Sequence, residues 1–369
     1  MYAFLSHSSA CDALRALDKD VSRFSRWPNR PRKLPRYGDC VSTQRAFHEY
    51  AREVDLKAYG MSDNTVHLLV PSASSRSRGK SATFHVWSRD LPAHSLYRLS
   101  DTLFASAPEF VLFQMAAQNF KSEPLIDDFV KKGQDEREFL KRIGSDEKLV
   151  YDDPFSWERK ARLISMALVA TEFAGYYRLP TALHDTRYRQ KPLVTLENQY
   201  AFLGANPNLY GVSRARKALE LAFDRSASPM ESALALMLSL PVEFGGFGLP
   251  KPELNKGIPT KQFESMWDGG PVITPDLQWE DHKIAVEYES DEFHNRLGAS
   301  KADSDAVRAN VLTAMGYAVF RATKSTAQSI SNTMRLARQV AQAMGGAVAD
   351  PSEVETIRRQ KLQSLLMSS

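Results

Sequence analysis

The first third of the chain combines two hydrophobic periods, and together they predict helices and strands in one region. The spacing of apolar positions over 42–59, with Ser42 as a candidate N-cap and Gly60 just past the end, predicts one amphipathic helix. Two β-rich runs at 66–70 and 83–87 flank a Ser/Gly loop, which predicts a wing or a long hairpin. Two more strands and a helix that opens with capping-box spacing are predicted at 97–99, 103–105 and 106–119. We therefore expect residues 1–122 to form an α+β region.

Helical spacing alone dominates the middle of the chain. A charged segment covers 127–148, an amphipathic helix is expected at about 157–177, and further helices are expected near 196–203 and 213–225. Apolar residues at this spacing are far more often core than contacts to a cofactor. Residues 123–226 are therefore expected to be a helical connecting region without chemistry of its own.

The last third alternates strands and helices. The pattern predicts strands at about 273–279 and 283–289, a helix at 300–315, a strand at 317–322 and a long helix at 325–344. This βαβ-like order is typical of an α/β domain, which we place at 227–348. Residues 349–369 are expected to be one more helix or a tail.

Composition places the chain among ordinary folded proteins. Hydrophobic residues make up 43% and charged residues 25%, which excludes collagen-like and wholly disordered classes. Two cysteines, Cys11 and Cys40, cannot build a disulfide framework, so a reducing compartment is expected. The sequence shows no apolar run of signal-peptide or membrane-span length. These features predict a cytoplasmic protein without a membrane partner.

Local charge is more informative than the net charge of +4. A proline-rich ribbon between residues 22 and 38 contains no acidic residue. Its cations are Arg23, Arg26, Arg30, Arg32, Lys33 and Arg36. The Ser/Gly loop adds Arg76, Arg78 and Lys80. Cations beside aromatic side chains suit a nucleic-acid backbone and its exposed bases, so these residues are candidates for nucleic-acid binding. The alternative is a pair of solvated loops.

Acidic residues gather in the predicted sheet of the last third. Glu287 and Glu289 share one face of their strand because side chains repeat every two residues, and Asp276 lies on the neighbouring strand. Like charges held together disfavour folding unless a cation or a shared proton neutralises them. Oxygen ligands suit Mg²⁺ or Mn²⁺, so a metal site is predicted here, with a solvated acidic face as the alternative.

These residues resemble the PD-(D/E)XK nuclease superfamily, in its branch similar to very-short-patch-repair endonucleases. Pro275-Asp276 is followed after ten residues by Glu287-Tyr-Glu289, and then by His294. The helix and strand that follow match the same branch through Asp305, Arg308, Leu312, Gly316, Tyr317, Val319 and Arg321. Glu231 resembles the acid that this superfamily often supplies from its first core helix. The resemblance covers about residues 228–345 and implies a restriction-endonuclease-like domain.

The resemblance implies hydrolysis of phosphodiester bonds by water activated on Mg²⁺ or Mn²⁺. It implies Asp276, Glu287 and Glu231 as metal ligands, and Asp276, Glu287, Glu289 and His294 as catalytic residues. Glu289 departs from the family, which usually has Lys there. Glu289 could bind a second metal, His294 could act as general base, or Lys301 could reach back from the next helix. A fourth interpretation is an inactive nuclease.

The N-terminal region resembles abortive-infection antitoxins, which combine a winged-helix DNA-binding part with a further α/β part. His67 and His85 are expected to be packed or edge histidines, and His7 among serines indicates no catalytic triad. We expect a metal-dependent DNA endonuclease acting in defence or repair. The alternative is a DNA-binding regulator or antitoxin-like protein with an inactive nuclease fold, and a toxin-type partner stays open.

Overall fold

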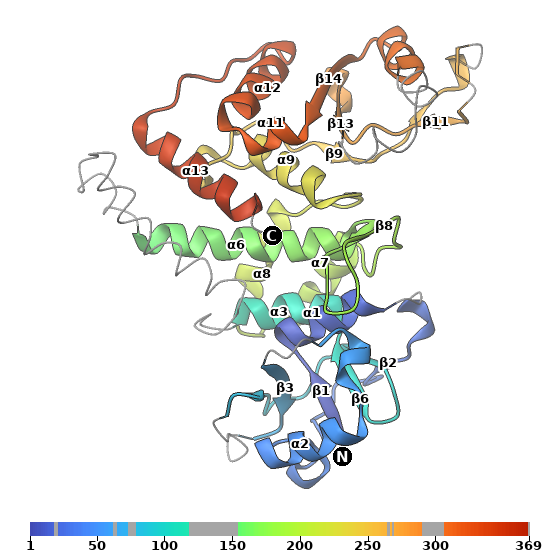
Figure 1. Cartoon of the computed structure of the whole chain (residues 1–369), viewed down its shortest axis with the longest axis vertical. Helices are drawn as coiled ribbons and strands as arrows, with labels where there is room; N and C mark the ends of the chain where they lie inside the picture. The colour runs from blue at the N-terminus through green and yellow to red at the C-terminus, as the bar shows by residue number, and fades with distance from the viewer. Residues whose placement is uncertain are drawn as a thin grey trace. The chain divides into compact units, whose positions relative to one another are not determined.

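The computed structural model describes residues 1–17, 21–61, 65–72, 79–117, 154–263, 266–267, 269–289 and 306–367. The chain is mixed α/β and divides into two compact units (Figure 1). The first comprises Met1–Lys131 with Ser165–Ala222, and the second comprises Lys132–Ile164 with Phe223–Ser369. The expected charged segment at 127–148 lies outside the described residues. The described helices of the expected middle region are divided between the two units.

A six-stranded mixed sheet forms the framework of the first unit, in the order β2-β5-β6-β1-β3-β4. Strand β1 (Ala3–Leu5) pairs in parallel with β6 (Leu103–Ser106) and antiparallel with β3 (Val66–Val70). Every residue of these three central strands is buried, which is typical of strands covered on both faces. The outer strands are β2 (Arg26–Trp27), β5 (Leu96–Arg98) and β4 (Ala82–Val86).

Helices α1 (His7–Ala16) and α3 (Pro108–Ala117) pack together, and α1 also contacts β1, β3 and β6 (Figure 1). Helix α3 is apolar on all sides, and its residues from Pro108 to Ala116 are buried. A helix of this kind needs neighbours all round, and α7 (Leu196–Ala205) and α8 (Val212–Leu221) contact it. Strands β7 (Tyr177–Arg178) and β8 (Arg187–Tyr188) form a separate small sheet.

Two sequence predictions in this unit were wrong. The single helix at 42–59 is a shorter helix, α2 (Gln44–Glu53), capped by the Thr43 hydroxyl, and a 3-10 helix, η3 (Leu56–Tyr59), capped by Asp55. The predicted wing or hairpin at 66–87 is absent from the described residues, because β3 pairs with β4 in parallel. A parallel pair needs a crossover between its strands. The nearly continuous apolar run of β3, interrupted only by His67, is typical of a buried central strand and was the signal against a hairpin.

The second unit contains a four-stranded sheet in the order β14-β13-β12-β9. Strand β13 (Ile284–Glu289) pairs antiparallel with β12 (Leu277–Trp279) and in parallel with β14 (Ala318–Thr323). A helical segment at 306–314 connects β13 to β14, which confirms the predicted βαβ order. Its Val311 and Leu312 pack in a buried cluster with Ala285 of β13. Strand β9 (Glu253–Leu254) completes the sheet beside β12.

The predicted strand at 273–279 is divided. Strand β11 (Val272–Ile273) pairs with β10 (Ile258–Pro259), whereas β12 begins only at Leu277. Pro275 lies between them and has no N–H for a sheet hydrogen bond.

Besides the helical segment at 306–314, the described helices of the second unit include α9 (Pro229–Ser239), α11 (Lys324–Gln328), α12 (Ile330–Ala343) and α13 (Glu353–Met367). The predicted helix at 325–344 is thus two helices, and the Ser329 hydroxyl caps the second. The stretch after Pro351 is helical, as one of the two alternatives predicted. Helix α9 contacts α11, α12 and α13. None of the helices within the described residues has the length and apolar character needed to cross a bilayer.

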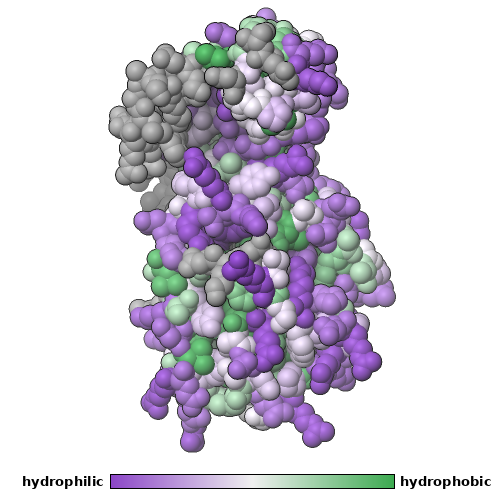
Figure 2. Space-filling model, turned by 90° about the vertical axis from the view of Figure 1, so that its right-hand side faces the viewer, coloured by the Kyte–Doolittle hydropathy of each residue, from purple (hydrophilic) through white to green (hydrophobic). Residues whose placement is uncertain are grey.

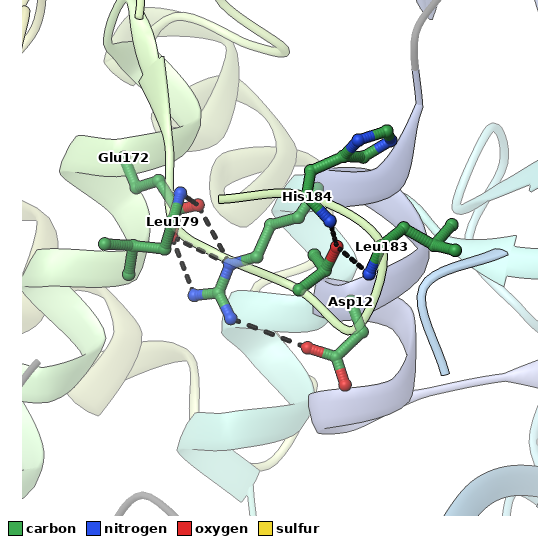
Figure 3. Close-up of polar contacts among 7 residues, drawn as sticks. Asp12, Glu172, Leu179, Leu183 and His184 are labelled. Atoms are coloured by element: carbon green, nitrogen blue, oxygen red, sulfur yellow. Dashed lines mark hydrogen bonds and ion pairs between the residues drawn. The ribbon is translucent and has the colours of Figure 1, made fainter. Parts of the chain in front are cut away.

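A buried ion pair joins distant parts of the first unit. The guanidinium of Arg15, in α1, donates to both carboxylate oxygens of Glu172, at 2.7 to 3.2 Å, near the end of α6 (Pro154–Ala174). Glu172 is fully buried and also accepts from the backbone N–H of Leu179 at 2.9 Å. Figure 3 shows the carboxylates of Glu172 and Asp12 directed at this guanidinium. Burial has the largest single effect and lowers the pKa of Arg15, but the charge and hydrogen bonds of Glu172, together with the charges of Cys11 and Asp12, outweigh it and the pKa is raised.

Substitution Glu172→Gln should destabilise the protein strongly, because it removes the close counter-ion of the buried Arg15 and leaves only Asp12, at 3.6 Å. The expected loss in the free energy of unfolding is about 3 to 5 kcal/mol. The matched control is Glu49→Gln, which breaks an exposed pair with Arg45 in α2 and should cost at most about 1 kcal/mol. Urea denaturation monitored by circular dichroism measures both. Equal small losses for the two variants would contradict this role of the buried pair.

Candidate functional site

Three of the predicted acids lie in the second unit, on three different elements. Glu231 is in the first turn of α9, where its backbone N–H donates to the hydroxyl of the N-cap residue Ser228 at 3.1 Å. One oxygen of its buried carboxyl accepts from the backbone N–H of Ala227 at 2.9 Å and from the amide of Asn255 at 2.7 Å. The capping residue thus begins a helix that places an acid inside the domain.

Asp276 lies directly before β12 and is held against β13. Its carboxylate accepts from the backbone N–H of Tyr288 at 2.6 Å. Because Leu277 is opposite Val286 in the antiparallel pair, Asp276 comes next to Glu287 across the two strands. The backbone of Asp276 also accepts from the N–H of Asn255 at 3.1 Å, and this residue contacts Glu231 through its side chain.

The charge of Asp276 acts on Glu231. Burial raises the pKa of Glu231, and the neighbouring negative charge of Asp276 raises it further, to about 8. The hydrogen bonds that Glu231 accepts have the opposite effect but are weaker. At neutral pH Glu231 is therefore mostly protonated, which is one of the two means of neutralisation expected from the sequence.

Glu287, in β13, is held by an arginine from the connecting helix. Arg308 donates to the Glu287 carboxylate at 3.1 Å and also to the backbone carbonyl of Thr274. Thr274 comes two residues before Asp276, so one guanidinium fixes both the strand acid and the backbone that leads to the other acid. Arg308 is the Arg of the matched helix motif, and the structure gives it this positioning contact.

Glu289 forms an ion pair with Arg321 of β14 at 3.0 Å, and both side chains are partly exposed. Arg321 is the Arg of the matched strand motif. The two arginines of the motif therefore neutralise the two glutamates of β13. His294 and Lys301, the other candidates for the role of the missing Lys, lie outside the described residues.

The donor set at this edge of the sheet fits a hard divalent cation in its chemistry, because carboxylate oxygens are the ligands that Mg²⁺ and Mn²⁺ prefer. Asp276 and Glu287 would hold such an ion, and Glu231 would join them on losing its proton. Within the described residues, one group of three potential ligands has its ligand atoms all within 4.8 Å of one another. That group is not the acidic one, and it lies in the first unit.

That group is His7, His67 and His85, which the sequence analysis interpreted as structural. The rings of His7 and His85 stack with centroids 3.8 Å apart, and Nδ1 of His67 lies 2.8 Å from Nε2 of His85. Burial lowers the pKa of His67 to about 4 and lowers that of His7 well below its usual range. The sequence carried one signal of this group, since each of the two β-rich runs contains a histidine, His67 or His85. Their observed register depends on the parallel pairing of the two strands, which the sequence analysis did not predict.

The basic ribbon is mostly exposed. Exposed side chains are Arg23, Arg30, Arg32, Lys33 and Arg36. Arg26 differs, because it donates to Glu109 at 3.0 Å and to the Tyr97 hydroxyl at 2.7 Å and so supports the domain itself. Trp27 packs on the rings of Phe4 and Phe104. In the Ser/Gly loop Lys80 is exposed, whereas Arg76 and Arg78 lie outside the described residues. Hydrophilic residues interleave with small apolar areas on the face shown in Figure 2.

The raised pKa of Glu231 predicts how stability depends on pH. The folded state keeps the Glu231 proton to about pH 8, whereas the unfolded chain releases it near pH 4.5. Stability should therefore fall as pH rises through this window, by up to about 1.4 kcal/mol per pH unit. Glu231→Gln accepts the same hydrogen bonds but cannot ionise, so its stability relative to wild type should increase between pH 5 and pH 8. Denaturation at the two pH values measures this, and an equal difference at both would refute it.

Comparison with known proteins identifies no family for the chain. It matches no protein-family model, and no solved structure matches it significantly. It is similar to two uncharacterized proteins of Mycobacterium tuberculosis, MT2308 of strain CDC 1551 / Oshkosh and Rv2248 of strain ATCC 25618 / H37Rv. The identity to each is 30% over 155 residues, which cover 42% of this chain and 51% of the relative. The chain thus spans about half the length of these curated relatives.

Proposed function

We propose that the protein is a metal-dependent DNA endonuclease of the PD-(D/E)XK type, with its nuclease site in the second unit. The proposal is supported by the placement of three acids: Asn255 donates to the Glu231 carboxyl and to the Asp276 backbone carbonyl, and Glu287 is opposite Asp276 in the strand pair. The negative charge of Asp276 also raises the pKa of the buried Glu231, so the two carboxyl groups interact. The resemblance assigns ligands to these same three positions.

A bound Mg²⁺ would supply activated water and would stabilise negative charge on the scissile phosphate. The residues of this chain prepare the site for it. The Tyr288 N–H orients Asp276, and Arg308 orients Glu287. Glu231 is protonated beside the negative charge of Asp276. A bound cation would attract the Glu231 carboxylate and favour loss of that proton. His294 remains our candidate general base.

The DNA-contacting part of the proposal is in the first unit. Backbone hydrogen bonds between Arg32 and Leu91 hold the ribbon against the unit, while its cations other than Arg26 are exposed. Cys11 and Cys40 are not joined in a disulfide, which supports a reducing compartment and thus the cytoplasm. A role in bacterial defence or repair is the setting that we propose for this activity.

One observation favours the alternative, a DNA-binding regulator that keeps an inactive nuclease fold. Where the superfamily usually has Lys, this chain has Glu289, and its charge is neutralised by Arg321. A carboxylate in an ion pair cannot polarise a water nucleophile as a lysine ammonium does. The two functions therefore differ in whether DNA that is bound is also cut.

The endonuclease proposal predicts Mg²⁺-dependent cleavage of plasmid DNA that Asp276→Asn or Glu287→Gln abolishes. Binding of DNA should persist in both variants, because each change removes a metal ligand and no phosphate contact. Glu253→Gln is the matched control, since Glu253 is on β9 of the same sheet and pairs with Lys256 at the surface. It should cut like wild type. Agarose gels measure cutting, and gel shifts in chelator measure binding.

Retained cutting by both acid variants would remove the assigned site. If the wild-type protein binds DNA but never cuts it, Glu289→Lys becomes the decisive variant, because it restores the usual side chain of the superfamily. Cutting that appears only in this variant would establish the regulator with an inactive nuclease fold.

The ribbon predicts a salt-dependent contribution to DNA binding. A variant with Gln at Arg30, Arg32 and Lys33 should bind all DNA sequences more weakly. The slope of log K against log salt should flatten by ~0.9 for every phosphate that the variant no longer neutralises. Arg45→Gln is the control, because Arg45 is an exposed cation of α2 in the same unit. Fluorescence anisotropy at several salt concentrations measures the slopes, and identical slopes for all three proteins would make the ribbon a solvated loop.

A further inference from the structure

The three histidines of the first unit come from three elements that the fold brings together. His7 begins α1, His67 is in β3, and His85 is in β4. One ring nitrogen of each lies within 4.8 Å of those of the other two. His7 and His67 are buried and His85 is half-buried. The proposed nuclease site does not use any of them.

Neighbouring groups fix the position of His7. Its φ of +51° is a left-handed conformation that non-glycine residues seldom adopt, and it persists only where the surroundings enforce it. The backbone N–H of His7 donates to Gln114 at 3.2 Å, and the Gln114 amide donates to Ser106 at 3.0 Å. The ring Nδ1 of His7 lies 2.9 Å from the hydroxyl of Ser6, which is fully buried. A hydrogen bond at one ring nitrogen leaves the other for a metal, as is usual for metal-binding histidines.

The two strand histidines are positioned by the sheet. In the parallel register His67 is opposite Thr83, and His85 is two residues further along β4, so their side chains leave the same face. The backbone N–H of His67 donates to the Ser9 hydroxyl of α1 at 2.9 Å, which ties the strand to the helix that carries His7. All three ligands therefore stand on regular elements rather than on loops.

The distance between the facing nitrogens suits a metal after a small adjustment. Two imidazole nitrogens on a tetrahedral Zn²⁺ at ~2.0 to 2.1 Å are ~3.3 Å apart. Nδ1 of His67 and Nε2 of His85 form a hydrogen bond at 2.8 Å, which a metal would replace, and rotation of the half-buried His85 ring would open the required space. Imidazole ligands suit Zn²⁺ and similar transition metals, whereas Mg²⁺ prefers oxygen.

We propose that His7, His67 and His85 form a binding site for Zn²⁺. The site supplies three protein ligands and leaves a fourth position for water or an outside ligand, the arrangement found in zinc sites that keep an open coordination position. Partial exposure of His85 gives this position access from solvent. The site differs from the acidic site in place, in ligand atoms and in metal, and it stands whether or not the protein cuts DNA.

Isothermal titration calorimetry of the metal-free full chain with Zn²⁺ tests the site. The acids of the second unit could also take up Zn²⁺, so Asp276→Asn serves as the background for every variant. In that background Zn²⁺ should bind at one site per chain. His85→Ala should weaken binding by about 100-fold or more, since even the loss of a supporting hydrogen bond costs about 10- to 100-fold. Ser6→Ala, which removes such a bond, should fall within that smaller range.

His48→Ala is the matched control, because His48 is an exposed histidine of α2 in the same unit, and it should bind Zn²⁺ like its parent. Excess Mg²⁺ should not displace the Zn²⁺. Circular dichroism establishes whether each variant is folded. If His85→Ala does not fold, X-ray absorption of the zinc-loaded parent decides, with three imidazole nitrogens at ~2.0 Å as the expected result. The proposal would be overturned if the parent does not bind Zn²⁺ or if folded His85→Ala binds it with equal affinity. A zinc coordination shell without imidazole would also overturn it.

Discussion

The need to neutralise buried carboxyl groups is the constraint on which the second unit depends. Glu231 is buried and Asp276 beside it is half-buried, so ionising both is costly. The structure solves this with a proton on Glu231, a backbone N–H at Asp276 and a guanidinium at Glu287. Each solution comes from a different element, and together they bring α9, the strand pair and the connecting helix to one edge of the sheet. A bound divalent cation would favour loss of the Glu231 proton.

The first unit meets the same constraint differently. Glu172 is fully buried, and Arg15 neutralises it through hydrogen bonds to both oxygens. That pairing is closed, because donor and acceptor satisfy each other within the fold. The three histidines differ, because their ring nitrogens lie within 4.8 Å of one another and the contact between His67 and His85 is a hydrogen bond that a metal would replace. Burial keeps His7 and His67 neutral at pH 7, which is the form with a lone pair to offer. We assign a stabilising role to the Arg15–Glu172 pair and a metal-binding role to the three histidines.

The sequence predicted the C-terminal βαβ order and the position of its acids, because strand periodicity and a short turn fix which residues become neighbours. It did not predict that Arg308 would hold Glu287, since a contact between a helix and a strand depends on packing rather than on spacing. It also missed the histidine group. A hairpin was expected at β3 and β4, and only parallel pairing brings His67 and His85 to one face beside the start of α1. Arg26 was counted among the nucleic-acid contacts because its ion pair with Glu109, 83 residues away, leaves no local signal.

We place a divalent cation at the acidic edge of the second unit. Electron paramagnetic resonance of Mn²⁺ titrated into the metal-free protein tests this most directly, because the free ion gives a signal that disappears on binding. We expect one Mn²⁺ to bind per chain through Asp276 and Glu287, and we expect Mg²⁺ to displace it. Binding should be absent in Asp276→Asn and should strengthen as pH rises and Glu231 loses its proton. Equal Mn²⁺ binding by wild type and Asp276→Asn, or none by wild type, would contradict it.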